Sequence, residues 1–191
     1  MFLETICINN SVINNIQPHL ERMETTAHNF GFTAPNLPNL IEVLPNELRT
    51  KKVRCSITYH KQILDIKFIE YTPRVIKSLK LIESDIIYSH KFSNREQLNN
   101  LLLQKGDCDE VLIIKNNYIT DTTFSNVVFK NKYGLFTPNT YLLNGTKRQS
   151  LIKQGIIIET EIAPSDIKNY EGLYLINAML DIGDTDLISN Y

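Results

Sequence analysis

Lys91 is the first residue to consider for chemistry, because a lysine amine can attack a carbonyl group as a nucleophile. It lies in "YSHKFSNREQL", residues 88–98, between a histidine and a polar segment that predicts the start of a helix. This stretch alone favours an ordinary solvated lysine, since lysines are mostly exposed. A catalytic role for Lys91 therefore depends on what the rest of the chain places around it.

Three further features could bind a charged ligand. Arg22, in "HLER", could hold a phosphate or carboxylate in a bidentate fork, although a surface arginine on an amphipathic helix is the simpler interpretation. The segment "LLNGTKRQSL" is a turn entering a helix, where N–H groups bind anions and Gly145 permits close approach. Asp121, in "YITDTTFSN", lies at a strand edge, where an aspartate usually caps a turn.

Together these four features match the requirements of pyridoxal 5'-phosphate (PLP). A lysine forms a Schiff base with this cofactor, and a carboxylate keeps its pyridine nitrogen protonated so that the ring withdraws electrons. An arginine and the N–H groups of a helix start suit its phosphate. Each feature is unspecific alone, but the combination makes Lys91 a candidate nucleophile.

Hydrophobic patterning and turn residues predict the elements that must position these residues. Strands are expected at residues 2–8, 52–60, 62–71, 78–83, 109–115, 118–121, 124–130, 135–138, 156–162 and 171–180. Helices are expected at residues 17–31, 93–106 and 146–155. In the second helix, Ser93 is the expected N-cap and Glu96 would close a capping box. The layout predicts two α+β lobes: a small one at 1–85 and a larger, pseudobarrel-like one at 86–191 that carries Lys91 near the seam.

The composition excludes several classes of partner. The chain has 191 residues, 42% of them hydrophobic, and a formal net charge of −1. A chain without excess positive charge gives no indication of a nucleic-acid partner. No apolar stretch could span a membrane and no signal peptide is recognisable, so we expect a cytoplasmic protein that binds no membrane.

Cys7 and Cys55 lie among apolar residues and are expected to be buried. The histidines show no metal-binding spacing, and no metal site is predicted.

Five segments, in order, resemble those of the class IV (fold-type IV) PLP-dependent enzymes. This family includes branched-chain aminotransferases, D-amino-acid transaminases and 4-amino-4-deoxychorismate lyases. The segments are "FLETICINNSVINNIQPHLERM", "YSHKFSNREQLNNLL", "CDEVLIIKNNYITDTTFSNVVF", "TPNTYLLNGTKRQSL" and "LYLINAMLDI", and the Asn-Ala pair in the last is most similar to the lyases. The resemblance implies an α+β, two-lobed fold like that of D-amino-acid aminotransferase, shortened at its N-terminus.

The resemblance also implies roles for individual residues. Lys91 would form the Schiff base with the cofactor, Arg22 would bind its phosphate, and Asp121 would take the place of the family's glutamate at the pyridine nitrogen. The residues that would complete the phosphate cradle are Gly145, Thr146, Lys147, Asn177 and Ala178. Asn126 is expected to shape the turn rather than touch the cofactor. A homodimer is the oligomeric state that the family implies.

The sequence departs from the family pattern at several positions. Asp121 is one methylene shorter than the family's glutamate, so either the backbone lies closer or the contact weakens. The family's "G-I-T-R" is "GTKR" here, which keeps the N–H donors but moves the threonine hydroxyl. Leu3 and Tyr59 stand where D-amino-acid transaminases hold the substrate carboxylate with an aromatic hydroxyl and an arginine. This difference counts against that activity.

The function that the resemblance favours is a lyase that converts 4-amino-4-deoxychorismate to 4-aminobenzoate and pyruvate for folate synthesis. Lys91 would remove a proton from the amine-bearing carbon and return one to the leaving fragment, with aromatisation driving the reaction. An aminotransferase acting on a D- or branched-chain amino acid is the first alternative. A degenerate, non-catalytic relative is the second. Whether Tyr59 and Tyr88 contact the substrate stays open.

Overall fold

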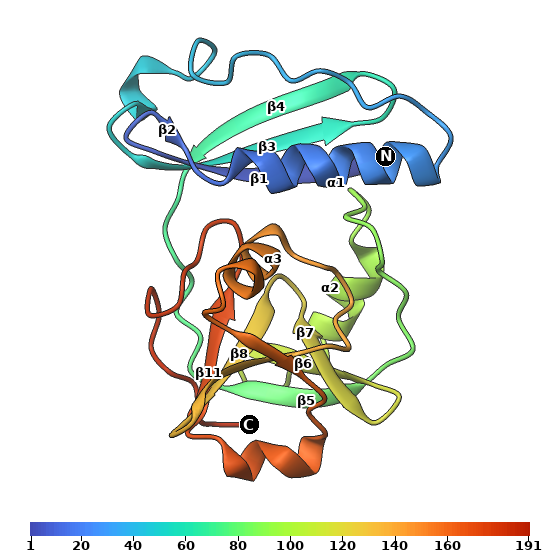
Figure 1. Ribbon diagram of the computed structural model, residues 1–191, viewed down its shortest axis with the longest axis vertical. Coiled ribbons are helices and arrows are strands. Elements are labelled where there is room, and N and C mark those ends of the chain that lie inside the picture. The colour runs from blue at the N-terminus through green and yellow to red at the C-terminus, as the bar shows by residue number, and fades with distance from the viewer. The chain divides into compact units, whose positions relative to one another are not determined.

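The computed structural model describes residues 1–191 and divides into two compact units (Figure 1). The N-terminal unit comprises Met1–Thr72 and His90–Asn94, and the C-terminal unit comprises Pro73–Ser89 and Arg95–Tyr191. The chain is of the α+β class, with three sheets and three α-helices, as the sequence predicts. None of the helices is both long and apolar enough to cross a membrane.

The N-terminal unit is a four-stranded antiparallel sheet with the strand order β2-β1-β3-β4. Its elements are β1 (Phe2–Asn9), β2 (Val12–Ile13), α1 (Ile16–Asn29), a 3₁₀ helix (Asn46–Leu48), β3 (Lys52–Tyr59) and β4 (Ile63–Glu70). Figure 1 shows α1 running alongside the strands of this sheet. Helix α1 ends before Gly31, whose φ of 69° favours glycine and stops the helix. The predicted strands and first helix of this unit are confirmed.

One face of the N-terminal sheet is buried. Side chains alternate between the two faces of a strand, and Phe2, Glu4 and Ile6 of β1 are all nearly inaccessible to solvent. Met23 from α1 packs against Phe2 and Tyr59 on this face. A carboxylate, Glu4, therefore occupies a core-facing position between two apolar residues.

Residues 90–94 return to the N-terminal unit and extend its sheet. Phe92 forms an antiparallel bridge with Phe2 of β1, and the Ser93 amide donates to the Met1 carbonyl at 3.2 Å. The predicted N-cap at Ser93 is therefore wrong: α2 begins at Glu96, and Arg95 occupies the cap position. Ser93 does not cap the helix because its hydroxyl, like its amide, donates to the Met1 carbonyl, at 3.3 Å.

The C-terminal unit contains two sheets, with the strand orders β5-β6-β7 and β10-β9-β8-β11. Its strands are β5 (Leu79–Glu83), β6 (Glu110–Lys115), β7 (Tyr118–Thr122), β8 (Asn126–Asn131), β9 (Gly134–Pro138), β10 (Ile158–Thr160) and β11 (Gly172–Ile176). Its helices are α2 (Glu96–Leu102), α3 (Thr146–Lys153) and a 3₁₀ helix (Pro164–Asn169). The predicted elements are all present, although several are shorter than expected.

Two connections in this unit lie next to residues of the expected site: the hairpin between β6 and β7, and the segment between β9 and β10. The hairpin between β6 and β7 turns at Asn116 and Asn117, whose positive φ angles of 51° and 66° suit a two-residue hairpin turn. Strand β9 runs parallel to β10, with α3 in the connection between them. The start of α3 therefore follows closely after the end of β9.

The division of the chain differs from the expected lobe boundary at residue 85. Strand β5 belongs to the C-terminal unit because it pairs along its whole length with β6. Lys91 belongs to the N-terminal unit because its segment pairs with β1. Among the cysteines, Cys7 and Cys55 are buried as predicted, and Cys108 is half-buried.

Candidate active site

Lys91 is the central residue of a three-residue turn. The amide of Phe92 donates to the His90 carbonyl at 2.8 Å, and the Lys91 carbonyl accepts from the Leu3 amide, also at 2.8 Å. Lys91 is half-buried, and its backbone is thus attached to β1 on one side and closed into a turn on the other. This double restraint fixes the origin of a long, flexible side chain.

Aromatic rings hold the residues on both sides of Lys91. The Phe92 ring lies 5.5 Å from that of Phe2, and the His90 ring meets Phe30 edge-on at 4.9 Å. The Asn29 amide also contacts Nε2 of His90 at 3.1 Å. Strand β1 and the end of α1 therefore support the lysine segment.

Arg22, on α1, is paired with the buried carboxylate of Glu4. Its Nε donates to Oε1 of Glu4 at 2.8 Å and its Nη2 donates to Oε2 at 2.6 Å. Nδ1 of His19 lies 2.7 Å from the same Oε2. The bidentate contact fixes the plane of the guanidinium, whose side chain is 12% exposed.

The charge of Glu4 is maintained by its partners. Burial alone would raise the pKa of Glu4, but the positive charge of Arg22 and the hydrogen bonds from Arg22 and His19 lower it from 4.5 to about 2. Sequence reasoning missed both Glu4 and His19. The available signal was a glutamate at a core-facing position of an alternating strand, which requires a buried cationic partner.

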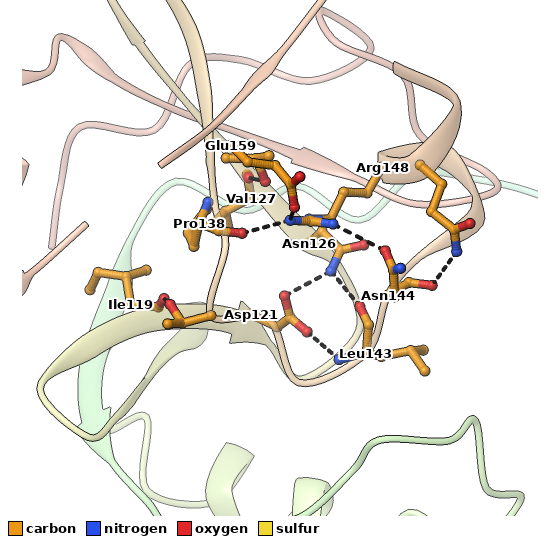
Figure 2. Close-up of polar contacts among 12 residues, drawn as sticks. Ile119, Asp121, Asn126, Val127, Pro138, Leu143, Asn144, Arg148 and Glu159 are labelled. Atoms are coloured by element: carbon orange, nitrogen blue, oxygen red, sulfur yellow. Dashed lines mark hydrogen bonds and ion pairs between the residues drawn. The ribbon is translucent and has the colours of Figure 1, made fainter. Parts of the chain in front are cut away.

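Asp121, near the end of β7, is buried and accepts three hydrogen bonds, of which Figure 2 draws those from Asn126 and Leu143. Its Oδ2 accepts from the backbone amides of Leu142 at 3.0 Å and Leu143 at 2.9 Å. Its Oδ1 accepts from Nδ2 of Asn126 at 2.8 Å. Burial raises the pKa of Asp121 from 3.8 to about 6, against the opposing effect of these bonds and of the Arg148 charge. The carboxylate is therefore mainly ionised at neutral pH.

Asp121 retains the capacity to accept one more hydrogen bond. A carboxylate offers about four acceptor positions, and the three donors take two on Oδ2 and one on Oδ1. The remaining position suits a single N–H donor, such as a protonated ring nitrogen. The hydrogen bonds to Asp121 thus leave an acceptor position that suits a pyridinium nitrogen. The aspartate, one methylene shorter than the family's glutamate, also holds the turn at Leu142 and Leu143.

Gly145 precedes α3, and the structure gives a specific reason for a glycine there. A Cβ at this position would lie 2.0 Å from Oδ1 of Asn126. Asn126 also donates to the Leu143 carbonyl at 2.9 Å, which confirms the prediction that it shapes the turn. A neighbouring side chain therefore requires the glycine, whereas the sequence had suggested an approaching ligand.

Thr146 and Lys147 form the first turn of α3. The first N–H groups of an α-helix have no acceptor within the helix and can bind an anion. The Thr146 side chain is buried, and the Lys147 ammonium forms an ion pair with Asp181 at 2.6 Å. The backbone of this turn, rather than the Lys147 side chain, is therefore the group suited to a phosphate.

Asn177 and Ala178 follow β11 in a tight turn. Oδ1 of Asn177 accepts from the amides of Met179 at 2.8 Å and Leu180 at 3.1 Å. Nδ2 of Asn177 donates to the Phe124 carbonyl at 3.3 Å, and Ala178 is half-buried. The Asn177 side chain therefore holds this turn against the connection between β7 and β8.

Arg148 is a buried residue near Asp121 that sequence reasoning did not single out. Its Nη2 donates to the Pro138 carbonyl at 2.9 Å and contacts Glu159, and its Nη1 donates to Oδ1 of Asn144 at 3.0 Å (Figure 2). The guanidinium also lies over the Tyr141 ring at 4.3 Å. Arg148 thereby joins the end of β9, β10 and the turn before α3.

The expected site residues fall into two groups. Lys91 and Arg22 belong to the N-terminal unit. The members in the C-terminal unit are Asp121, Gly145, Thr146, Lys147, Asn177 and Ala178, and Asn126 connects Asp121 to the turn that contains Gly145. Tyr59 is buried in the core at 1% exposure and Tyr88 at 7%.

Comparison with known proteins identifies the family. Residues 1–185 match the family model described as amino-transferase class IV. The chain belongs to the class IV aminotransferase family. Members of this family are PLP-dependent aminotransferases and lyases, and the protein is accordingly an enzyme of the fold-type IV architecture that the sequence predicts.

Relatives of this class IV enzyme cover nearly the whole chain. An uncharacterised protein of Haemophilus influenzae is 38% identical over 180 residues, which are 92% of this chain and 96% of that protein. The crystal structure of a proposed 4-amino-4-deoxychorismate lyase from Haemophilus somnus is 34% identical, with a TM-score of 0.83 over 93% of this chain and 95% of the other.

More distant structures share the fold. The PLP-bound form of a hypothetical aminotransferase from Mycobacterium tuberculosis has a TM-score of 0.77 at 16% identity, covering 93% of this chain and 77% of the other. At this identity the likeness concerns the fold alone. The same architecture therefore holds PLP in at least one relative.

Proposed function

We propose that this class IV enzyme is a PLP-dependent lyase that converts 4-amino-4-deoxychorismate to 4-aminobenzoate and pyruvate. The observation that carries this choice is the 34% identity, over 93% of the chain, to the proposed lyase of Haemophilus somnus. A role in folate synthesis and a homodimer belong to the same proposal, because the family resemblance implies them. The cytoplasmic location that we expect from the sequence belongs to it as well.

The groups in the two units suit the parts of PLP. The Arg22 guanidinium, oriented by Glu4, offers a rigid cation for the phosphate. In the C-terminal unit, the first turn of α3 offers N–H groups that also suit a phosphate. The carboxylate of Asp121 has one acceptor position left for the pyridine nitrogen. When bound, PLP would supply an electron sink next to the substrate carbon that loses its proton.

Lys91 would carry the proton transfers. Its amine would hold the cofactor and, once released by the substrate amine, would take the proton from the amine-bearing carbon. It would then return a proton to the departing three-carbon fragment as the ring of the product becomes aromatic. The two restraints on the Lys91 backbone keep the origin of its side chain fixed during both transfers.

The cofactor is tested by absorbance. Purified protein incubated with PLP should absorb in the visible range, and borohydride should attach the cofactor covalently to Lys91, as peptide mass spectrometry would show. The Lys91→Ala variant should give neither result. Wild-type protein that stays colourless with excess PLP would contradict the proposal.

The reaction is tested by product analysis. With 4-amino-4-deoxychorismate, the enzyme should release 4-aminobenzoate and pyruvate in equal amounts. The alternative is an aminotransferase, which the family model equally includes. Amino transfer from D- or L-alanine to a keto acid, without release of 4-aminobenzoate, would establish this alternative and reject the lyase.

A further inference from the structure

Asn126 uses its buried amide to connect two parts of the C-terminal unit. It begins β8 and is 6% exposed. Its Nδ2 donates to Oδ1 of Asp121 at 2.8 Å and to the Leu143 carbonyl at 2.9 Å. Both partners are acceptors, so the nitrogen of the amide must face them and the orientation of the side chain is fixed.

The other end of the amide lies against Gly145. The position of a Cβ on Gly145 is 2.0 Å from Oδ1 and 3.2 Å from Cγ of Asn126. Asn126 could move aside for such a Cβ only by giving up hydrogen bonds that a buried amide needs. The position of the Asn126 amide therefore requires a glycine at residue 145.

Asp121 completes the connection from the opposite side. Its Oδ2 accepts from the amides of Leu142 and Leu143, in the same turn whose carbonyl Asn126 binds. Figure 2 shows Asp121 and Asn126 directed toward this turn, with Asn144 and Arg148 beyond it. Strands β7 and β8 and the entry to α3 are therefore held together through two side chains.

We propose that Asn126 is a positioning residue that sets the Asp121 carboxylate and the start of α3 relative to each other. This inference rests on the proposed function, in which Asp121 meets the pyridine nitrogen of PLP and the start of α3 binds its phosphate. One amide would thereby fix the separation of the groups that hold the two ends of the cofactor. The distance between the ends of PLP is constant, so a fixed separation favours binding.

The pairing of Asn126 with Gly145 is tested without cofactor by a double-mutant cycle on thermal unfolding. Gly145→Ala should lower the Tm of the apoprotein by roughly 4–8 °C, because the new Cβ displaces the Asn126 amide. In an Asn126→Ala background the same change should cost almost nothing, because the space is free. Additive losses of Tm would overturn the pairing.

The positioning role is tested by the affinity for PLP and for pyridoxal, which lacks the phosphate, followed by absorbance. Asn126→Ala should weaken PLP binding about 10-fold or more and pyridoxal binding only about threefold, since pyridoxal uses one of the two anchored ends. Asn144→Ala is the matched control: it removes the bond to Arg148 in the same turn but leaves Asp121 untouched. Its PLP affinity should stay within about twofold of wild type.

The outcomes separate this inference from the proposed function. If wild type binds PLP and Asn126→Ala binds it equally well, the positioning role is wrong while the proposed function stands. If Asn126→Ala weakens PLP and pyridoxal by the same factor, Asn126 acts on Asp121 alone and the two-ended role is overturned. If wild type binds no PLP, the proposed function fails, and the positioning role fails with it.

Discussion

Individual carboxylates in this protein owe their properties to the groups around them. Glu4 and Asp121 are both buried, but Glu4 faces a guanidinium at 2.6 Å whereas Asp121 faces two amides and an asparagine. The pKa of Glu4 is accordingly lowered to about 2, and that of Asp121 is raised to about 6. Sequence reasoning found Asp121 through its motif and missed Glu4, because only the fold shows that α1 brings Arg22 to it.

Glu4→Gln should destabilise the protein at neutral pH. The lowered pKa of Glu4 means that its charge contributes stability above the ordinary pKa of 4.5, which is lost as the pH falls toward about 2. A shift of this size corresponds to on the order of 3 kcal/mol in the free energy of unfolding. Urea unfolding at pH 7 and pH 3 measures it, and the gap between wild type and variant should narrow at pH 3.

The matched control for this prediction is Glu24→Gln. Glu24 lies on the same helix as Arg22 but is exposed, so its substitution should change the free energy of unfolding by less than about 0.5 kcal/mol. An equal loss in both variants would show that the Glu4 pairing does not determine the stability.

Asp121→Asn should reduce activity more than stability. The raised pKa of Asp121 means that folding favours its protonated form, so its charge lowers stability as the pH rises from 3.8 to about 6 and throughout the range above. The neutral asparagine removes the loss of stability that the buried charge causes. However, its own side-chain amide faces the amide of Asn126, and it cannot keep a pyridine nitrogen protonated. We expect kcat to fall about 100-fold or more, with a Tm close to that of wild type. Unchanged kcat would contradict the role of Asp121.

At the scale of elements, hydrophobic patterning predicted the strands and helices, but contacts between distant parts of the chain decided where an element such as α2 begins. The alternation of "FLETICI", Pro18 in the first turn of α1 and Gly31 after its end are local signals, and both elements form as expected. The capping box at Ser93 is also a local signal, but it fails because the amide and the hydroxyl of Ser93 both donate to the carbonyl of Met1, 92 residues away in sequence. A single sequence contains no direct record of that pairing.

Phe92→Ala should loosen the lysine segment from β1. Phe92 opposes Phe2 in the bridge and lies 6.0 Å from the Phe30 ring, so the variant loses the packing that holds residues 90–94 in place. Hydrogen exchange should become faster at the Leu3 amide, which donates to the Lys91 carbonyl. Leu103→Ala, at a position that is 82% exposed, should leave that exchange rate unchanged. Equal protection of Leu3 in both variants would contradict this account of how Lys91 is held.

At the scale of the whole molecule, the order of five weak motifs predicted more than any element did. The family match over residues 1–185 confirms the fold class that those motifs implied. The boundary between the two units differs from the expectation, because β5 pairs with β6 in the C-terminal unit and because the chain returns to the N-terminal unit for five residues, His90–Asn94. A segment of five residues is too short to be recognised from its amino-acid composition. Only its pairing with β1 shows that it belongs to the N-terminal unit.

A ligand that binds only the folded chain should stabilise the whole molecule. PLP at about 100 times its Kd would contribute roughly 2.7 kcal/mol to the free energy of unfolding, or a rise in Tm of about 5–10 °C for a chain of this size. Lys91→Ala should show a smaller rise, because it keeps the phosphate and pyridine contacts but loses the covalent one. Arg22→Ala should also show a smaller rise, because it keeps the amine and loses the cation that we assign to the phosphate. Differential scanning fluorimetry with and without PLP measures these shifts, and an unchanged Tm for wild type would argue against PLP as the cofactor, whatever the variants do.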